Sequence, residues 1–285
     1  MQPMKTNTLK VPGATLHYEI RGSGPTLLLI CGGIYDTARY AGLAERLADR
    51  YTVVTYDRRG NSRSPLDGPP EPQSIEVHGD DAHRVLVEVG VTADEPAHVF
   101  GNSSGAIIGL ELAARHPEQV RTLVSHEPPL FELLPDRDRW RAVIRDVEEA
   151  FATEGTGAAM RAFAAGFDRT GREHEEAAPR GERGEPTVEM AEAMARMEKN
   201  MEFFIGYEVS PFVVYLPDVE ALRTSSARVV MVAGEDSEGQ PPYRASFVVA
   251  EQIGGRHVMF PGDHGAFGTR HEAFAAKLDE VLSSP

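Results

Sequence analysis

The sequence predicts an α/β protein with a mostly parallel central sheet flanked by helices and with an inserted helical cap. Short aliphatic runs alternate with helical patterns along most of the chain, an order that gives a parallel sheet covered on both faces. This alternation stops between about residues 135 and 216, where the pattern becomes helical. We therefore expect a core of residues 1–135 and 216–285 and a cap of residues 136–215.

The expected strands are short aliphatic runs bounded by turn residues, as buried parallel strands should be. In chain order they fall at residues 53–54, 99–100, 123–124 and 229–232, and helical patterns cover residues 39–49, 74–89 and 106–116. Residues 168–189 of the cap are rich in Arg, Glu, Gly and Pro and lack the apolar side chains that tight folding requires. We expect a mobile loop there.

A G-x-S-x-G pentapeptide at residues 101–105 places Ser103 between an apolar run and a helical pattern. A serine at such a sharp strand-to-helix turn is held in a strained backbone conformation, and the two glycines leave room for the neighbouring strand and helix. This context favours a nucleophile over an ordinary Gly/Ser turn with the same letters.

Three further stretches give the chain a resemblance to the α/β-hydrolase superfamily. Residues 26–34 resemble the strand that leads into the oxyanion loop, although the histidine that commonly precedes the glycine is absent here. Residues 51–64 resemble the next strand with its D-x-R-G-x-x-x-S turn, and residues 258–267 resemble the last strand and the loop that carries the catalytic histidine. The resemblance covers nearly the whole chain and implies the α/β-hydrolase fold.

The same resemblance selects His264 as the catalytic base from ten histidines. It alone lies in a Gly-rich loop directly after the last expected strand, at the edge where an open α/β sheet binds its ligands. His126 is better explained as a packed or pocket-lining residue than as a second base.

The acid of a Ser-His-acid triad has two candidates. The usual place, three residues after Gly234, holds Ser237, and Asp236 stands one residue early, which turns its side chain to the other face. Glu127 follows the preceding strand and is fixed by two prolines, a placement that resembles the zearalenone lactonases. We predict Glu127; Asp236 is the alternative if its loop bulges, and capping of the next helix is the alternative role of Glu127.

These residues predict acyl transfer to water. His264 takes the proton of Ser103 and returns it to the leaving alkoxide, while Glu127 fixes the imidazole tautomer. Backbone N–H groups of Gly33 and Ser104 then bind the negative charge on the substrate carbonyl. The sequence thus predicts a serine hydrolase that cleaves a carboxylic ester or lactone through an acyl-enzyme intermediate.

A row of methionines in the cap has helical spacing, with separations of four, three and four residues. This face either packs the cap onto the core or roofs a substrate pocket, because thioethers adjust readily to ligands. With the nearby phenylalanines, it predicts a medium-sized apolar substrate. The expected pocket residues are Gly32, Ile34, Met190, Met194, Met197, Met201 and Phe204.

Composition restricts the class of partner. The formal net charge of −15, from 44 acidic and 29 basic residues, argues against nucleic acid. The single cysteine, Cys31, excludes an internal disulfide, fits a reducing compartment and is expected to be buried. We expect a cytoplasmic protein without a membrane partner, because no apolar run reaches the length of a signal peptide core or a membrane span.

The expected partner is a small-molecule substrate, with no cofactor and no metal. The sequence shows no metal-ligand spacing, phosphate loop or dinucleotide fingerprint. Two alternatives stay open: a cofactor-free perhydrolase or haloperoxidase, which uses the same triad, and a non-catalytic ligand-binding protein on the same scaffold. A serine at position 103 disfavours a third, the aspartate-nucleophile enzymes. The natural substrate and the oligomeric state do not follow from the sequence.

Overall fold

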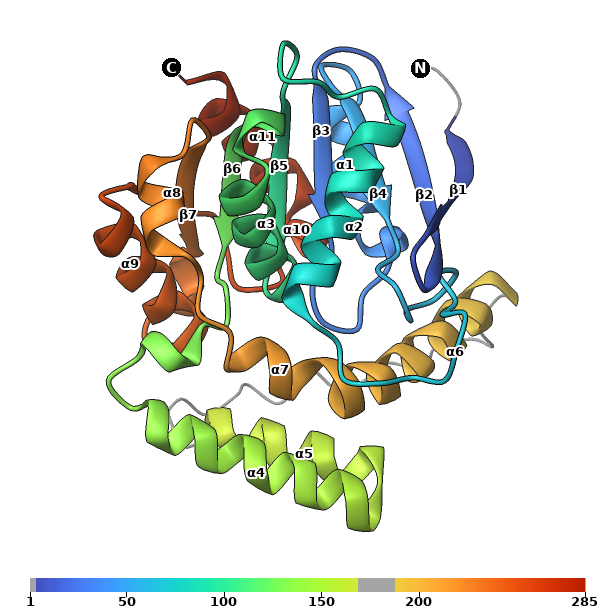
Figure 1. The fold of residues 1–285 in the computed structure, drawn as a ribbon, viewed down its shortest axis with the longest axis vertical. Coiled ribbons are helices and arrows are strands. Elements are labelled where there is room, and N and C mark those ends of the chain that lie inside the picture. Colours follow the sequence, from blue (N-terminus) through green and yellow to red (C-terminus); the bar gives the residue numbers. More distant parts are fainter. Residues whose placement is uncertain (1–3, 169–187, 285) are drawn as a thin grey trace.

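The computed structural model describes residues 4–168 and 188–284, so the stretch predicted as a mobile loop lies almost entirely outside the described residues. An eight-stranded sheet forms the centre of the described part, in the order β1-β2-β4-β3-β5-β6-β7-β8 (Figure 1). β2 pairs antiparallel with β1 and β4, and all other pairs are parallel. The strands are β1 (Lys5–Val11), β2 (Ala14–Gly22), β3 (Thr26–Ile30), β4 (Thr52–Tyr56), β5 (Ala97–Asn102), β6 (Val120–His126), β7 (Arg228–Gly234) and β8 (Arg256–Phe260).

Helices cover both faces of this sheet, which confirms the predicted α/β class (Figure 1). One face carries α1 (Ala41–Leu47), α10 (Ala266–Thr269) and α11 (His271–Ser283). The other carries α2 (Ile75–Glu88), α3 (Ser104–Arg115), α8 (Val219–Thr224) and α9 (Pro241–Ile253). Short 3-10 turns, η1 (Thr37–Tyr40), η2 (Pro117–Gln119), η3 (Phe131–Leu133) and η5 (Glu235–Ser237), complete the core.

Strand β3 shows why the central strands are unbroken apolar runs in the sequence. Leu28 and Ile30 pack in the cluster beneath α2 and α3, whereas Leu27 and Leu29 pack in the cluster beneath α1 and α11. Successive side chains of a strand point to opposite faces. A strand covered on both faces therefore needs an apolar side chain at every position.

Sequence reasoning did not find the hairpin of β1 and β2. The side chains of β1 are exposed along most of its length, and its residues are largely polar, so no apolar run marks it. Its pairing with β2 is continuous from Lys5, opposite Ile20, to Val11, opposite Ala14. The hairpin is an edge element held mainly by backbone hydrogen bonds.

The chain between β6 and β7 forms a layer of helices. It comprises α4 (Arg137–Glu154), α5 (Thr156–Asp168), α6 (Val188–Phe203), the π-helical turn η4 (Phe204–Glu208) and α7 (Val209–Val213). Figure 1 shows this layer along the edge of the sheet that lies opposite the two chain ends. We call it the cap; its bounds as a separate unit, residues 136–215, stay a prediction.

Two smaller expectations concern burial. Cys31 is buried just after β3, and burial raises the pKa of its thiol well above the ordinary value. The thiol therefore stays protonated near neutral pH, as expected for a packed residue. None of the helices in the described ranges is long and apolar enough to cross a bilayer.

Candidate active site

Ser103 occupies the sharp turn that joins β5 to α3. Its φ of 55° and ψ of −126° lie in a region that non-glycine residues seldom adopt. The backbone N–H of Ser103 donates to the His126 carbonyl at 2.9 Å. A Cβ at Gly101 would stand 2.2 Å from the Gly105 carbonyl oxygen, and one at Gly105 would stand 2.1 Å from that of Ile30. Glycines at both flanks are therefore a packing requirement, as the sequence predicts.

Glu127 has the second strained backbone, directly after β6, with φ of 49°. Its side chain is buried, and its Oε1 accepts the Gly234 N–H at 2.8 Å. Oε2 lies 2.5 Å from Nδ1 of His264. Burial alone would raise the pKa of the Glu127 carboxyl, but the bonds from His264 and Gly234 and the nearby histidines lower it to about 2. The carboxylate is therefore ionised at neutral pH and fixes the imidazole tautomer.

The loop after β8 holds His264 in place through its backbone as well as its ring. Asn102 Nδ2 donates to the His264 carbonyl at 3.1 Å and also lies 2.9 Å from His126 Nδ1. Asn102 is the second residue of the G-x-S-x-G pentapeptide, so the serine turn and the histidine loop are tied directly. Sequence reasoning missed this link, because position two of the motif carries no specific signal.

Asp236, the alternative acid, lies in η5 with about half of its side chain exposed. Its carboxylate pairs with Arg270 at 3.1 Å. Ser237, at the usual position of the acid, is buried. The carboxylate that is hydrogen-bonded to the His264 ring is that of Glu127.

Gly33 and Ser104, the two residues predicted to bind the oxyanion, are in contact. The sequence predicts that both backbone N–H groups face the substrate, but one of them bonds to the other residue. The Gly33 N–H donates to the Ser104 hydroxyl oxygen at 2.8 Å. Ser104 is the first residue of α3, where backbone N–H groups lack intrahelical partners and the helix dipole favours negative charge. The corner formed by these two residues has its Gly33 N–H engaged by the Ser104 hydroxyl, and its role as the oxyanion site stays a prediction.

One cavity of about 530 Å³ contains Ser103, Ser104, Glu127 and His264. The rest of its wall is largely aromatic and aliphatic and also includes four polar residues. The lining comprises Pro129, Phe131, Phe163, Phe167, Phe204, Val209, Phe212, Val213 and Pro242, together with Asp236, Ser237, Gln240 and Asp263. Phe204 is a predicted pocket residue that does line it.

The predicted methionine roof is wrong for the members whose side chains are described. Met194, Met197 and Met201 do not line this cavity, and Met194 and Met197 are 60% and 40% exposed. Met197 instead borders a separate cavity of about 170 Å³. The side chain of Met190 lies outside the described residues.

The reason is the orientation of α6. Its inward face carries Arg196, Asn200 and Phe203, at positions i, i+4 and i+7, and Asn200 and Phe203 are buried. Two of the three are polar or charged, so an apolar pattern does not identify this face. Of the other predicted pocket residues, Ile34 borders the smaller cavity, and Gly32 lies against the Asn102 carbonyl and the Ser103 side chain.

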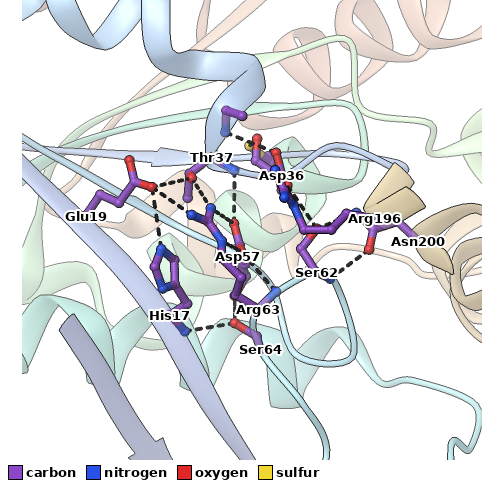
Figure 2. A network of polar contacts seen from close by, with 12 residues as sticks. His17, Glu19, Asp36, Thr37, Asp57, Ser62, Arg63, Ser64, Arg196 and Asn200 are labelled. Atoms are coloured by element: carbon purple, nitrogen blue, oxygen red, sulfur yellow. Dashed lines mark hydrogen bonds and ion pairs between the residues drawn. The ribbon is translucent and has the colours of Figure 1, made fainter. Parts of the chain in front are cut away.

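A polar network anchors the loops around this corner (Figure 2). Buried Asp57, just after β4, accepts the Thr37 N–H at 3.0 Å and the Arg63 Nε at 2.8 Å. Glu19 of β2 accepts from Thr37 and Arg63 as well, at 2.9 and 3.1 Å. From the cap, Arg196 Nε donates to Asp36 at 3.0 Å. The polar contacts of this one turn thus fix the loops after both β3 and β4.

One set of donor atoms within the described residues has the spacing of a metal site. These atoms belong to His126, Glu127 and His264 and lie within 4.8 Å of one another. Each residue already has a hydrogen-bond partner in the cluster or in Asn102. The contact between Glu127 and His264 is a charge-assisted hydrogen bond, whereas the buried Nε2 of His126 has no hydrogen-bond partner in the part of the chain that the structure describes. The expected absence of a metal stays a prediction.

A serine on a strained strand-to-helix turn, in a cavity with a carboxylate-bound histidine, is typical of enzymes that use a nucleophile elbow. Comparison with known proteins agrees. The pattern of the Alpha/beta hydrolase family matches residues 20–277, and the chain belongs to this family. It is therefore a hydrolase of the α/β type.

Individual relatives extend this assignment. The uncharacterized hydrolase YraK of Bacillus subtilis is 38% identical over 287 residues, which cover 98% of this chain and 96% of YraK. A thermophilic esterase of Thermogutta terrifontis has a TM-score of 0.70 at 20% identity, covering 99% of this chain and 98% of its own. The enol-lactonase of Burkholderia xenovorans LB400 has a TM-score of 0.67 at 19% identity, covering 98% and 100%. The two structures show the common fold.

Buried and half-buried histidines make stability depend on pH. Burial lowers the pKa of His98, His126 and His257 to about 4 from an ordinary 6.5. Between these values the unfolded chain binds more protons than the folded protein, so the free energy of unfolding falls as the pH falls. We expect the melting temperature to fall between about pH 7 and about pH 4.5, less steeply in His126→Gln. Equal slopes in the variant and the wild type would contradict this assignment.

Proposed function

We propose that the protein is a serine hydrolase that cleaves a carboxylic ester or a lactone through an acyl-enzyme intermediate. The observation that carries the proposal is the bond of 2.5 Å between Glu127 Oε2 and His264 Nδ1 in the cavity that also contains Ser103. With Nδ1 engaged by the carboxylate, the other ring nitrogen, Nε2, accepts the Ser103 proton. The serine oxygen then attacks the substrate carbonyl.

The ionised Glu127 stabilises the imidazolium that forms at this step. The tetrahedral oxyanion is bound at the corner of Gly33 and Ser104. His264 returns the proton to the leaving alkoxide, and water activated by the same ring releases the acid product. For a lactone, the alkoxide stays attached to the acyl group, so ring opening is the first half of the same reaction.

The cavity supports a medium-sized apolar substrate. Five phenylalanines line it, with two prolines and two valines, and its volume of about 530 Å³ falls within the usual range for small-molecule sites. Two proteins with the same fold are an esterase and an enol-lactonase. Glu127 directly follows β6, a placement that resembles the zearalenone lactonases. This resemblance stays a prediction, and it makes a lactone one of the predicted substrate classes.

The proposed triad is tested by three substitutions assayed on p-nitrophenyl butyrate. Ser103→Ala should lower kcat by on the order of 10⁴ to 10⁶, since it removes the nucleophile. Glu127→Gln keeps the side-chain shape but removes the charge that stabilises the imidazolium, so kcat should fall by on the order of 10⁴. Asp236→Asn is the matched control and should change kcat by less than about tenfold, because it alters a half-exposed ion pair.

Circular dichroism of each variant checks folding. Loss of activity in Asp236→Asn together with near-normal activity in Glu127→Gln would assign the acid to Asp236. Retention of a tenth of the activity in Ser103→Ala would refute the nucleophile.

The aromatic wall is tested by the preferred acyl length. Phe204→Ala enlarges the cavity and should shift the preference among p-nitrophenyl esters of graded length toward longer acyl chains. Met194→Ala, on the exposed face of α6, is the control and should leave the preference unchanged. The ratio of kcat/KM between long and short esters is the measurement. If the preferred acyl length shifted in Met194→Ala but not in Phe204→Ala, the aromatic wall would be contradicted and a pocket lined by methionines supported.

A further inference from the structure

Arg58 is completely buried between the sheet and the cap, although the proposed chemistry gives it no role so far. It is the second residue of the D-x-R-G turn that follows β4, a position without a specified residue type in that motif. A buried guanidinium is expensive unless its donors and its charge are satisfied. Its partners therefore indicate what the arginine holds in place.

Two of these partners are Gly33 and Ser104, which together form the corner proposed to bind the oxyanion (the oxyanion corner). Arg58 Nη2 donates to the Gly33 carbonyl at 2.5 Å, and Nη1 lies 3.5 Å from the Ser104 hydroxyl oxygen. The same hydroxyl accepts the Gly33 N–H at 2.8 Å. Gly33 has a φ of 55° and no atom within 4 Å of where its Cβ would be, so its own packing does not fix its conformation. The planar guanidinium supplies that constraint from outside.

The charge of Arg58 is balanced from the cap. Nη2 lies 3.0 Å from Glu208 Oε2, and neither side chain is exposed to solvent. Asn61 Nδ2 donates to Glu208 Oε1 at 3.1 Å. Glu208 is the last residue of the π-helical turn η4, a rare geometry that is frequent at functional sites. The oxyanion corner is thus connected, through one arginine, to the turn that follows α6.

A second cap residue holds the next carbonyl of the same loop. Asn200 Nδ2 donates to the Ile34 carbonyl at 3.0 Å and to the Ser62 hydroxyl at 2.8 Å. Its Oδ1 accepts the Ser62 N–H at 2.7 Å (Figure 2). Two consecutive carbonyls, those of Gly33 and Ile34, are therefore held by side chains that belong to the cap or are paired with it. Because a peptide group is planar and joins the C=O of one residue to the N–H of the next, holding the Ile34 carbonyl also orients the Tyr35 N–H. The Tyr35 N–H donates to the Gly32 carbonyl at 3.3 Å, and this carbonyl belongs to the same planar group as the Gly33 N–H.

We propose that Arg58 is a positioning residue for the oxyanion corner and that Glu208 makes its position depend on the cap. The inference rests on the proposed hydrolase function. It predicts that the Arg58–Glu208 pair acts on the transition state, where the oxyanion forms, and much less on substrate binding. A displacement of the cap would then lower the rate of the chemical step while the position of Ser103 stays unchanged.

The same turn offers a matched control pair. Arg59 Nε and Nη2 donate to Asp81 at 2.6 and 2.7 Å, and both side chains are nearly buried. The Arg59 side chain donates to Asp81 and to the Pro12 carbonyl, neither of which belongs to the oxyanion corner. Removing either ion pair should affect stability similarly, whereas only the first is expected to affect the chemical step.

The test compares Arg58→Met/Glu208→Gln with Arg59→Met/Asp81→Asn, so that neither variant keeps a lone buried charge. With p-nitrophenyl butyrate, the first should lower kcat by on the order of 10²-fold with KM changed by less than about threefold. It should also weaken inhibition by an alkyl trifluoromethyl ketone, which forms a tetrahedral adduct, by on the order of 10²-fold. The second variant should leave both within about threefold of wild type.

Equal effects in the two variants, or an unchanged kcat in the first, would overturn the inference. If the first variant does not fold, Arg58→Lys replaces it: one ammonium cannot span Gly33, Ser104 and Glu208 together, so kcat should fall at least about tenfold, and an unchanged kcat overturns the inference. A wild-type protein without esterase or lactonase activity would instead refute the proposed function, and this inference with it.

Discussion

Two strained residues at the ends of adjacent strands determine the geometry of this protein. Ser103 after β5 and Glu127 after β6 both have positive φ, a conformation that costs on the order of 1–3 kcal/mol each. Ladder bonds to the neighbouring strand ends hold them: Ser103 N–H to the His126 carbonyl, and Glu127 N–H to the Val232 carbonyl. The staggered ends of β5, β6 and β7 thereby direct the serine and the carboxylate into one cavity.

The helices, the neighbouring loops and the cap hold Ser103 and Glu127 in place and close the cavity around them. Helices on both faces bury almost every side chain of the central strands, so the ends of these strands are held firmly in place. Buried ionic and amide groups also fix the loops after β3 and β4, with Asp57, Arg58 and Asn200 at the centres of these contacts. The cap therefore contributes polar anchors to the core as well as aromatic side chains to the cavity.

Much of this could be predicted from local signals. The glycines around Ser103 and the apolar runs of the central strands mark features that depend on near neighbours in the sequence. The inward face of α6 could not be predicted by hydrophobic periodicity, because it is formed by Arg196, Asn200 and Phe203. Arg58 was equally hidden, since its partners lie 25 to 150 residues away in the sequence. Such long-range polar contacts carry no periodic pattern.

The most direct test of the account is to find which residue reacts with a fluorophosphonate probe. The folded protein is labelled, digested and sequenced by mass spectrometry. An activated serine in this cavity should give one adduct, on the peptide that contains Ser103, and labelling should be much slower when Glu127 is replaced by glutamine. An adduct on Ser104 or elsewhere, or a folded protein that does not react, would contradict the account.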